Sequence, residues 1–156
     1  MGTESPMKIR DVLAQKGARV FTARPDKTIE QALALLSEHN ISSLIVVNLH
    51  GDPEGIATER SILHLMAKRG RAAFSLPLTE AMQAPMPTCT PDMPVNEGLR
   101  KMTVDRNKHL AVLDEDGRLA GLVSIGDLVK AKLQDSELEG RVLRDLAYGH
   151  IVATSV

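Results

Sequence analysis

The chain has 156 residues, a formal net charge of −1 and 43% hydrophobic residues, which fits one compact domain or two small halves that share a core. The balanced charge lacks the basic footprint of a nucleic-acid-binding protein, and an aromatic content of 2% leaves little to stack on bases. The single cysteine, Cys89, excludes an internal disulfide, and no apolar run is long enough for a membrane span, so we expect a cytoplasmic protein without membrane, nucleic-acid or metal binding.

The first half of the chain predicts alternating short strands and helices. Thr28 and Gln31 have the spacing of a capping box, and Asn40 is a plausible helix stop. A β-branched run follows and ends at a turn that contains Gly51 and Pro53. The expected elements are a helical turn at 8–17, a strand at 20–22, a helix at 28–40, strands at 44–47 and 55–57, and a helix from 58 to about 70.

The second half repeats this order after a basic connector at 69–77. Pro94 suits the first turn of a helix, where its missing N–H is not needed. The expected elements are a helical turn at 78–82, a helix from 94 to about 106, strands at 110–113 and 119–123, and a helix from 124 that runs to about 148.

Residues 25–63 align with residues 91–129 at a constant offset and without a gap. A duplication of this length predicts an α/β (α+β) fold in which two β-α-β-β-α units pack about a pseudo-two-fold axis. A site formed by one copy can therefore recur in the other. The identical positions are Pro25/Pro91, Asp26/Asp92, Leu33/Leu99, Leu44/Leu110, Val46/Val112, Gly51/Gly117 and Gly55/Gly121.

The motif at 110–127 reads Leu-Ala-Val-Leu-Asp-Glu-Asp-Gly-Arg-Leu-Ala-Gly-Leu-Val-Ser-Ile-Gly-Asp, and with its first copy it resembles the CBS domain, named after cystathionine β-synthase. The resemblance covers about residues 8–133 and implies a small tandem pair, or Bateman module. The implied divisions are CBS domain 1 at 8–70, CBS domain 2 at 78–133 and a helical extension at 134–150. Such pairs pack their sheets together and leave two clefts, which in this family often bind AMP, ADP, ATP, NAD or S-adenosylmethionine.

Ser124 and Asp127 stand where the last strand passes into the last helix. The resemblance implies that Ser124 lies near a phosphate and that Asp127 holds ribose hydroxyls. A helix N-terminus offers N–H groups and a positive dipole to an anion, which suits the first role. By pattern alone the pair is an N-terminal helix cap, and both roles can coexist.

The first copy departs from this motif. Thr58 keeps the hydroxyl, but Ser61 replaces the aspartate and can make only a weaker hydrogen bond to ribose. We therefore expect the first cleft to be empty, weak or adapted to another ligand. Arg60 is either a phosphate clamp or a solvated helix residue.

Further candidates precede the strands. Lys108 and His109 are implied to reach phosphate beside Ser124 and Asp127, with Arg106 nearby; alternatively these cations cover a solvated helix end. Their first-copy counterparts Ser42 and Ser43 can donate hydrogen bonds without charge. The residues expected to line adenine, or simply to belong to the core, are Val20, Phe21, Met86 and Pro87.

No nucleophile, metal set or acid/base pair supports an enzyme. We predict a non-catalytic regulatory module that binds an adenine nucleotide (AMP, ATP or NAD) and signals to an unidentified effector protein. The alternative is a structural interaction module without a physiological ligand, which the loss of aspartate at Ser61 favours. We also expect a homodimer through apolar helix faces, formed by Ile62, Leu65 and Met66 in the first copy and Leu128, Val129 and Leu133 in the second.

Overall fold

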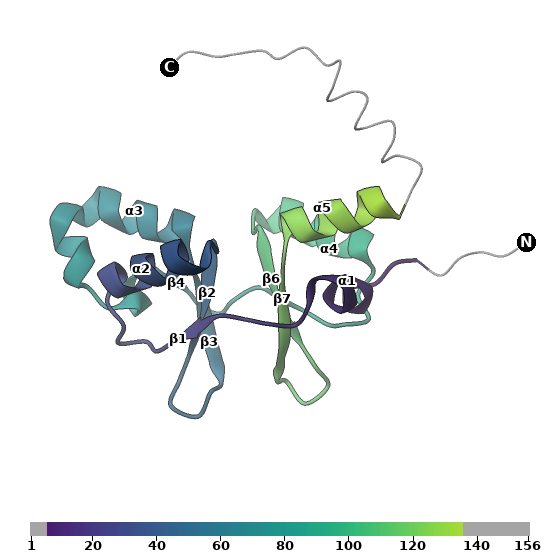
Figure 1. Ribbon diagram of the computed structural model, residues 1–156, viewed down its shortest axis with the longest axis horizontal. Helices are drawn as coiled ribbons and strands as arrows, with labels where there is room; N and C mark the ends of the chain where they lie inside the picture. Colours follow the sequence, from purple (N-terminus) through teal and green to yellow (C-terminus); the bar gives the residue numbers. More distant parts are fainter. Residues whose placement is uncertain (1–5, 136–156) are drawn as a thin grey trace, which may run out of the picture.

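The computed structural model describes residues 6–135, and these residues form two small α/β units that lie side by side (Figure 1). The first half of the chain contains α1 (Ile9–Lys16), β1 (Thr22–Ala23), α2 (Ile29–His39), β2 (Ser43–Val47), β3 (Pro53–Thr58) and α3 (Glu59–Arg69). The second half contains two 3₁₀ helices, η1 (Gly70–Ser75) and η2 (Leu78–Ala81), then β4 (Met82–Gln83), β5 (Thr88–Cys89), α4 (Val95–Asp105), β6 (His109–Leu113), β7 (Leu119–Ser124) and α5 (Ile125–Gln134). The predicted β-α-β-β-α order is confirmed in both copies.

The strands form two separate sheets with the same internal register. One sheet has the order β1-β2-β3-β4 and the other has the order β5-β6-β7. The first strand of each copy pairs in parallel with the next, and that strand pairs antiparallel with the third. Ser43 lies opposite Thr58 in the first hairpin, as His109 lies opposite Ser124 in the second, so the ends of both hairpins are equivalent.

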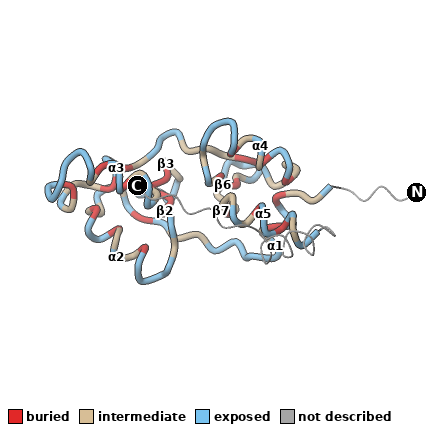
Figure 2. The backbone as a smooth tube through the Cα atoms, turned by 90° about the horizontal axis from the view of Figure 1, so that it is seen from above, coloured by how far each residue is buried: buried red, intermediate tan, exposed pale blue. Residues whose placement is uncertain are grey.

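Each central strand is buried on both faces, because it contributes to two cores. Leu44 and Val46 of β2 point into the core of the first unit, and Leu110 and Val112 of β6 point into the core of the second. The alternate side chains of the same strands join a third, smaller core between the two sheets, since successive side chains of a strand face opposite ways. This third core contains Ile45, Ile56 and Ala111, with Val20, Val47, Met86, Leu119 and Leu122 packed against it. Figure 2 shows the buried positions inside both units.

The segment that precedes each repeat packs against the other repeat. Ile9 of α1 is fully buried in the second core, and its N–H donates to the carbonyl of Met93 at 2.9 Å. Leu78 of η2 is fully buried in the first core, and its N–H donates to the carbonyl of Lys27 at 2.7 Å. The two units are therefore linked by an exchange, which Figure 1 shows as α1 lying beside β7 and α5. The predicted division at 8–70 and 78–133 describes the repeats along the chain, whereas the packed units cross that division.

The expected dimer face needs a correction. Ile62, Leu65 and Leu128 are buried in the cores of their own units, with exposed fractions of 1%, 8% and 0%, because they form the inward sides of α3 and α5. Leu63 and Val129 are the large exposed apolar residues of these helices, at 64% and 42%. The predicted helical extension at 134–150 falls almost wholly outside the described residues. Among the described helices, none is long and apolar enough to cross a membrane.

Candidate functional site

Asp127 caps the helix on which it stands. The Asp127 N–H donates to Ser124 Oγ at 3.1 Å, and the Ser124 N–H donates to Asp127 Oδ2 at 2.8 Å. This reciprocal pair is a capping box, so the structural interpretation of the Ser124–Asp127 spacing is confirmed. The cap fixes the carboxylate at the junction of β7 and α5.

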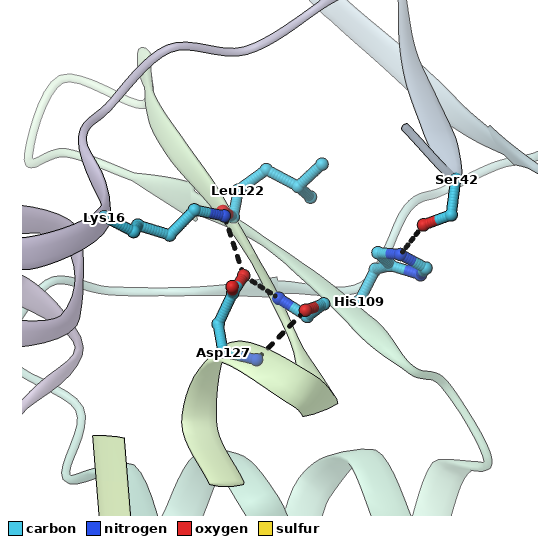
Figure 3. A network of polar contacts seen from close by, with 6 residues as sticks. Lys16, Ser42, His109, Leu122 and Asp127 are labelled. Atoms are coloured by element: carbon cyan, nitrogen blue, oxygen red, sulfur yellow. Dashed lines mark hydrogen bonds and ion pairs between the residues drawn. The ribbon is translucent and has the colours of Figure 1, made fainter. Parts of the chain in front are cut away.

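Lys16 of α1 forms an ion pair with the same carboxylate. Its Nζ lies 2.7 Å from Asp127 Oδ2 and donates to the Leu122 carbonyl at 2.8 Å (Figure 3). Burial alone would raise the pKa of Asp127, but the hydrogen bonds from Lys16 and Ser124 outweigh burial and hold this pKa below its usual value. Asp127 is therefore ionised at neutral pH and is already engaged through one oxygen.

A pocket opens beside Asp127, and we call it the Asp127 pocket. It has a volume of about 480 Å³ and is lined by both repeats and by the segment between α1 and β1. Val20, Phe21, Ser42 and Ser43 line it together with Ser124 and Asp127. Six of the candidate residues named from the sequence thus lie around one pocket. Ser42 and Ser43, expected as the first-copy counterparts of Lys108 and His109, line the same pocket as Asp127 of the second copy. Arg19, Asn40 and Ile41 also line it.

A second pocket of about 370 Å³ lies around the start of α3, and we call it the Arg106 pocket. Thr58, Arg60 and Ser61 line it from the first repeat, and Arg106 and Lys108 line it from the second. The expectation that Lys108 accompanies Asp127 is therefore wrong. The Lys108 carbonyl does accept the Ile125 N–H at 2.8 Å, beside the start of α5, but Lys108 lines the Arg106 pocket.

His109 and Ser42 stand between the two pockets. Both residues line both pockets, as does Glu59, and Ser42 Oγ lies 3.3 Å from His109 Nε2 (Figure 3). Burial is the main cause that lowers the pKa of His109, with smaller contributions from Lys16 and Lys108, while Asp127 opposes them. The imidazole is therefore neutral at pH 7 and available as a hydrogen-bonding group.

Ser61 is tied into the cap of its own helix. Its Oγ accepts the Thr58 N–H at 2.9 Å and donates to the Thr58 carbonyl at 3.0 Å, while its N–H donates to Thr58 Oγ1 at 3.1 Å. The hydroxyl donor is thus used within the backbone of the turn. Ser61 does not reproduce the carboxylate of Asp127.

The remaining apolar candidates divide between pocket and core. Pro87 lines the Arg106 pocket, whereas Met86 packs into the core between the sheets. Sequence reasoning missed Lys16 and Gln83, whose Nε2 donates to Asn107 Oδ1 at 3.1 Å across the Arg106 pocket. A lysine in the last turn of a helix has an ordinary explanation in the helix dipole, so no motif connected Lys16 with Asp127. The described residues contain no group of three or more His, Cys, Asp or Glu side chains placed to hold a metal ion.

A family model described as the CBS domain matches residues 9–68 and again residues 78–134. The structure agrees with this match. It has two sheets in contact, each with its helices, and a pocket at the strand-to-helix turn of each copy. The chain belongs to the CBS domain family, as a tandem pair.

Solved structures of CBS-domain proteins share the fold over most of the chain. One from Agrobacterium tumefaciens is 33% identical, with a TM-score of 0.79 over 85% of this chain and 98% of that chain. One from Burkholderia ambifaria is 32% identical, with a TM-score of 0.78 over 84% of this chain and 97% of that chain. An uncharacterized protein from Methanopyrus kandleri is 29% identical over 113 residues, and the match spans 58% of its length.

Proposed function

We propose that this protein is a non-catalytic regulatory module that binds an adenine nucleotide, such as AMP or NAD, in the Asp127 pocket. The observation that carries the proposal is the position of Asp127. An ionised carboxylate, fixed by its own cap, lines a pocket to which both repeats contribute. A fixed carboxylate is suited to accept hydrogen bonds from the paired hydroxyls of a ribose.

The geometry leaves one carboxylate oxygen for a ligand. Lys16 and the Ser124 N–H both use Oδ2, and no hydrogen bond found among residues 6–135 uses Oδ1. Val20 and Phe21 supply apolar surface for a base, since both are half-buried in the same pocket. Ser42 and Ser43 add hydroxyl groups, and Arg19 adds a positive charge.

A structural relative supports the class of ligand. The CBS domain pair of protein MJ0100, which is 25% identical with a TM-score of 0.74, was solved in complex with 5′-methylthioadenosine and S-adenosyl-L-methionine. Both are adenosine derivatives, and both carry the ribose that Asp127 would recognise here. We infer that this chain senses an adenine nucleotide in the cytoplasm and passes the signal to an effector protein.

A thermal-shift panel tests the proposal, because a ligand that binds only the native state raises the melting temperature. The panel contains AMP, ADP, ATP, NAD, NADH and S-adenosylmethionine, each with wild type and with Asp127→Ala. We expect at least one ligand to stabilise the wild type and to lose most of its effect on Asp127→Ala. No shift with any member would contradict nucleotide sensing and favour a purely structural interaction module.

A further inference from the structure

The two pockets differ in charge at equivalent positions of the repeat. Arg60, Arg106 and Lys108 line the Arg106 pocket, and their counterparts in the alignment are the neutral residues Gly126, Asn40 and Ser42. Conversely, the Arg106 pocket has the neutral Ser61 at the position where the Asp127 pocket has the carboxylate of Asp127. Three differences toward positive charge and one away from negative charge therefore meet in a single cavity. One difference opposes them, because Glu59 stands where the other repeat has the neutral Ile125.

We propose that the Arg106 pocket is a separate binding site for a polyphosphate group, and that it does not read a ribose. The site requires nothing from the Asp127 pocket, so the proposal stands whether or not a nucleotide binds there. Guanidinium and ammonium groups that converge on one cavity match the several oxygen atoms of a di- or triphosphate.

The cations of this pocket are not neutralised by protein carboxylates. The ion pairs found within residues 6–135 are those of Arg10 with Asp92 and of Lys16 with Asp127. Arg60, Arg106 and Lys108 thus form none in this part of the chain, although Glu59 lines the same pocket. Glu59 also lines the Asp127 pocket and stands at the shared edge, where its carboxylate disfavours an anion that would extend from one pocket into the other.

The backbone at Arg106 points to the same conclusion. Arg106 follows the last residue of α4 in a left-handed conformation, with φ 56°, and its counterpart Asn40 follows α2 with φ 52°. Asparagine tolerates this conformation, whereas a long side chain adopts it at a cost in stability. The strained backbone therefore places an arginine at the pocket where the first repeat has an asparagine, which supports a role for its guanidinium there.

The pocket also has no carboxylate at the position from which Asp127 would hold a ribose in the other repeat. Ser61 donates its hydroxyl to the Thr58 carbonyl, so this donor is occupied by the helix cap. Asn107, another residue of the pocket, accepts from Gln83 and ties β4 to the loop before β6. This hydrogen bond holds the loop with Arg106 and Lys108 against the first unit.

Isothermal titration calorimetry with inorganic tripolyphosphate tests the site in the full chain. We expect one tripolyphosphate per chain for the wild type. Two variants copy the other repeat: Arg106→Asn reproduces Asn40, and Lys108→Ser reproduces Ser42. Each should weaken binding about tenfold or more, the scale of losing a hydrogen bond to a charged group. Arg106→Asn should at the same time raise the melting temperature by about 2 to 4 °C, because it removes the backbone strain.

Two controls separate this site from general charge effects and from the Asp127 pocket. Arg100→Ala removes an exposed cation of α4 that lines neither pocket, and it should leave tripolyphosphate binding within about twofold of wild type. Asp127→Ala should do the same, even if it abolishes nucleotide binding.

Competition with ATP identifies the source of the polyphosphate group. If ATP displaces tripolyphosphate from the Asp127→Ala variant, the site exists and binds the phosphate tail of a nucleotide. If ATP does not displace it, the site exists and binds a free polyanion. Undetectable tripolyphosphate binding by the wild type would overturn the proposal, as would equal losses in Arg100→Ala and Lys108→Ser.

Discussion

Asp127 shows how one carboxylate serves both structure and a proposed site. Through Oδ2 it accepts the Ser124 N–H and the Lys16 ammonium, which joins α1 to the start of α5. The side chains of Lys16 and Asp127 are 34% and 26% exposed, so solvent weakens the ion pair without removing it.

Lys16→Met should destabilise the protein by about 0.5 to 1 kcal/mol at neutral pH, the scale of a partly exposed ion pair. Because the pKa of Asp127 is lowered in the folded state, its pairing stabilises the protein above the usual carboxyl pKa of about 4 and is lost as the pH falls through the lowered value. Urea unfolding at pH 7 and in acid measures the difference between wild type and variant. The difference should shrink in acid; a constant difference would show that Lys16 acts by packing alone.

Prediction from sequence worked where the signal is local. The caps at Thr28 and Ser124 and the apolar runs of β2 and β6 depend on neighbouring residues. Both caps lie where they were predicted, and each strand begins one residue before its predicted start. By contrast, the pocket that the Lys108 side chain lines is set by tertiary packing and not by neighbouring residues. Its backbone lies beside Ile125 in the structure, but the expectation of a side chain near Asp127 rested on the family resemblance alone.

At the scale of elements, the exchange of α1 and η2 between the units had no sequence signal. Along the chain, α1 precedes the first repeat and η2 precedes the second repeat. Only tertiary contacts place each of these segments against the opposite repeat.

The backbones of β3 and β4 approach each other closely. Gly55 of β3 lies against β4, and a Cβ at Gly55 would come within 2.6 Å of the Gln83 carbonyl oxygen. Glycine there allows β4 to pair with β3 and brings Gln83 to the Arg106 pocket.

Gly55→Ala should therefore destabilise the protein by about 1 to 3 kcal/mol, as overpacking does, because the backbone of β4 must shift. Gly126→Ala is the matched control, since Gly126 is exposed and a Cβ there would meet Ser124 Oγ at an ordinary 3.6 Å. Gly126→Ala should leave the free energy of unfolding unchanged or raise it by up to about 1 kcal/mol, because alanine favours a helix more than glycine does. Urea unfolding compares the two variants, and equal stability would refute the close approach.

For the whole molecule, equivalent exposed residues mark the outer sides of α3 and α5. Leu63 and Val129 occupy the same position in the two repeats, and Figure 1 shows their helices along the same face of the molecule. A homodimer through this face remains our prediction. It is carried by Val129, which the sequence had indicated, and by Leu63 in place of the buried Ile62 and Leu65.

Light scattering of the wild type should give a mass about twice the 16.9 kDa of one chain. Leu63→Glu combined with Val129→Glu should give a monomer, because two charges would be buried in the interface. Leu49→Glu is the control, since Leu49 is 78% exposed in the turn between β2 and β3, away from these helices. A monomeric wild type at micromolar concentration would end the dimer prediction.

The two pockets are lined by different charges, and we propose that only the Asp127 pocket recognises a nucleoside. Calorimetric titration with AMP tests it most directly. The wild type should bind one AMP per chain with high affinity. Asp127→Ala should lose about 1.5 to 3 kcal/mol of binding free energy, as expected for hydrogen bonds to a charged group, and Ser61→Asp should strengthen or create a second site. Two equal tight sites in the wild type, or unchanged binding by Asp127→Ala, would contradict the claim.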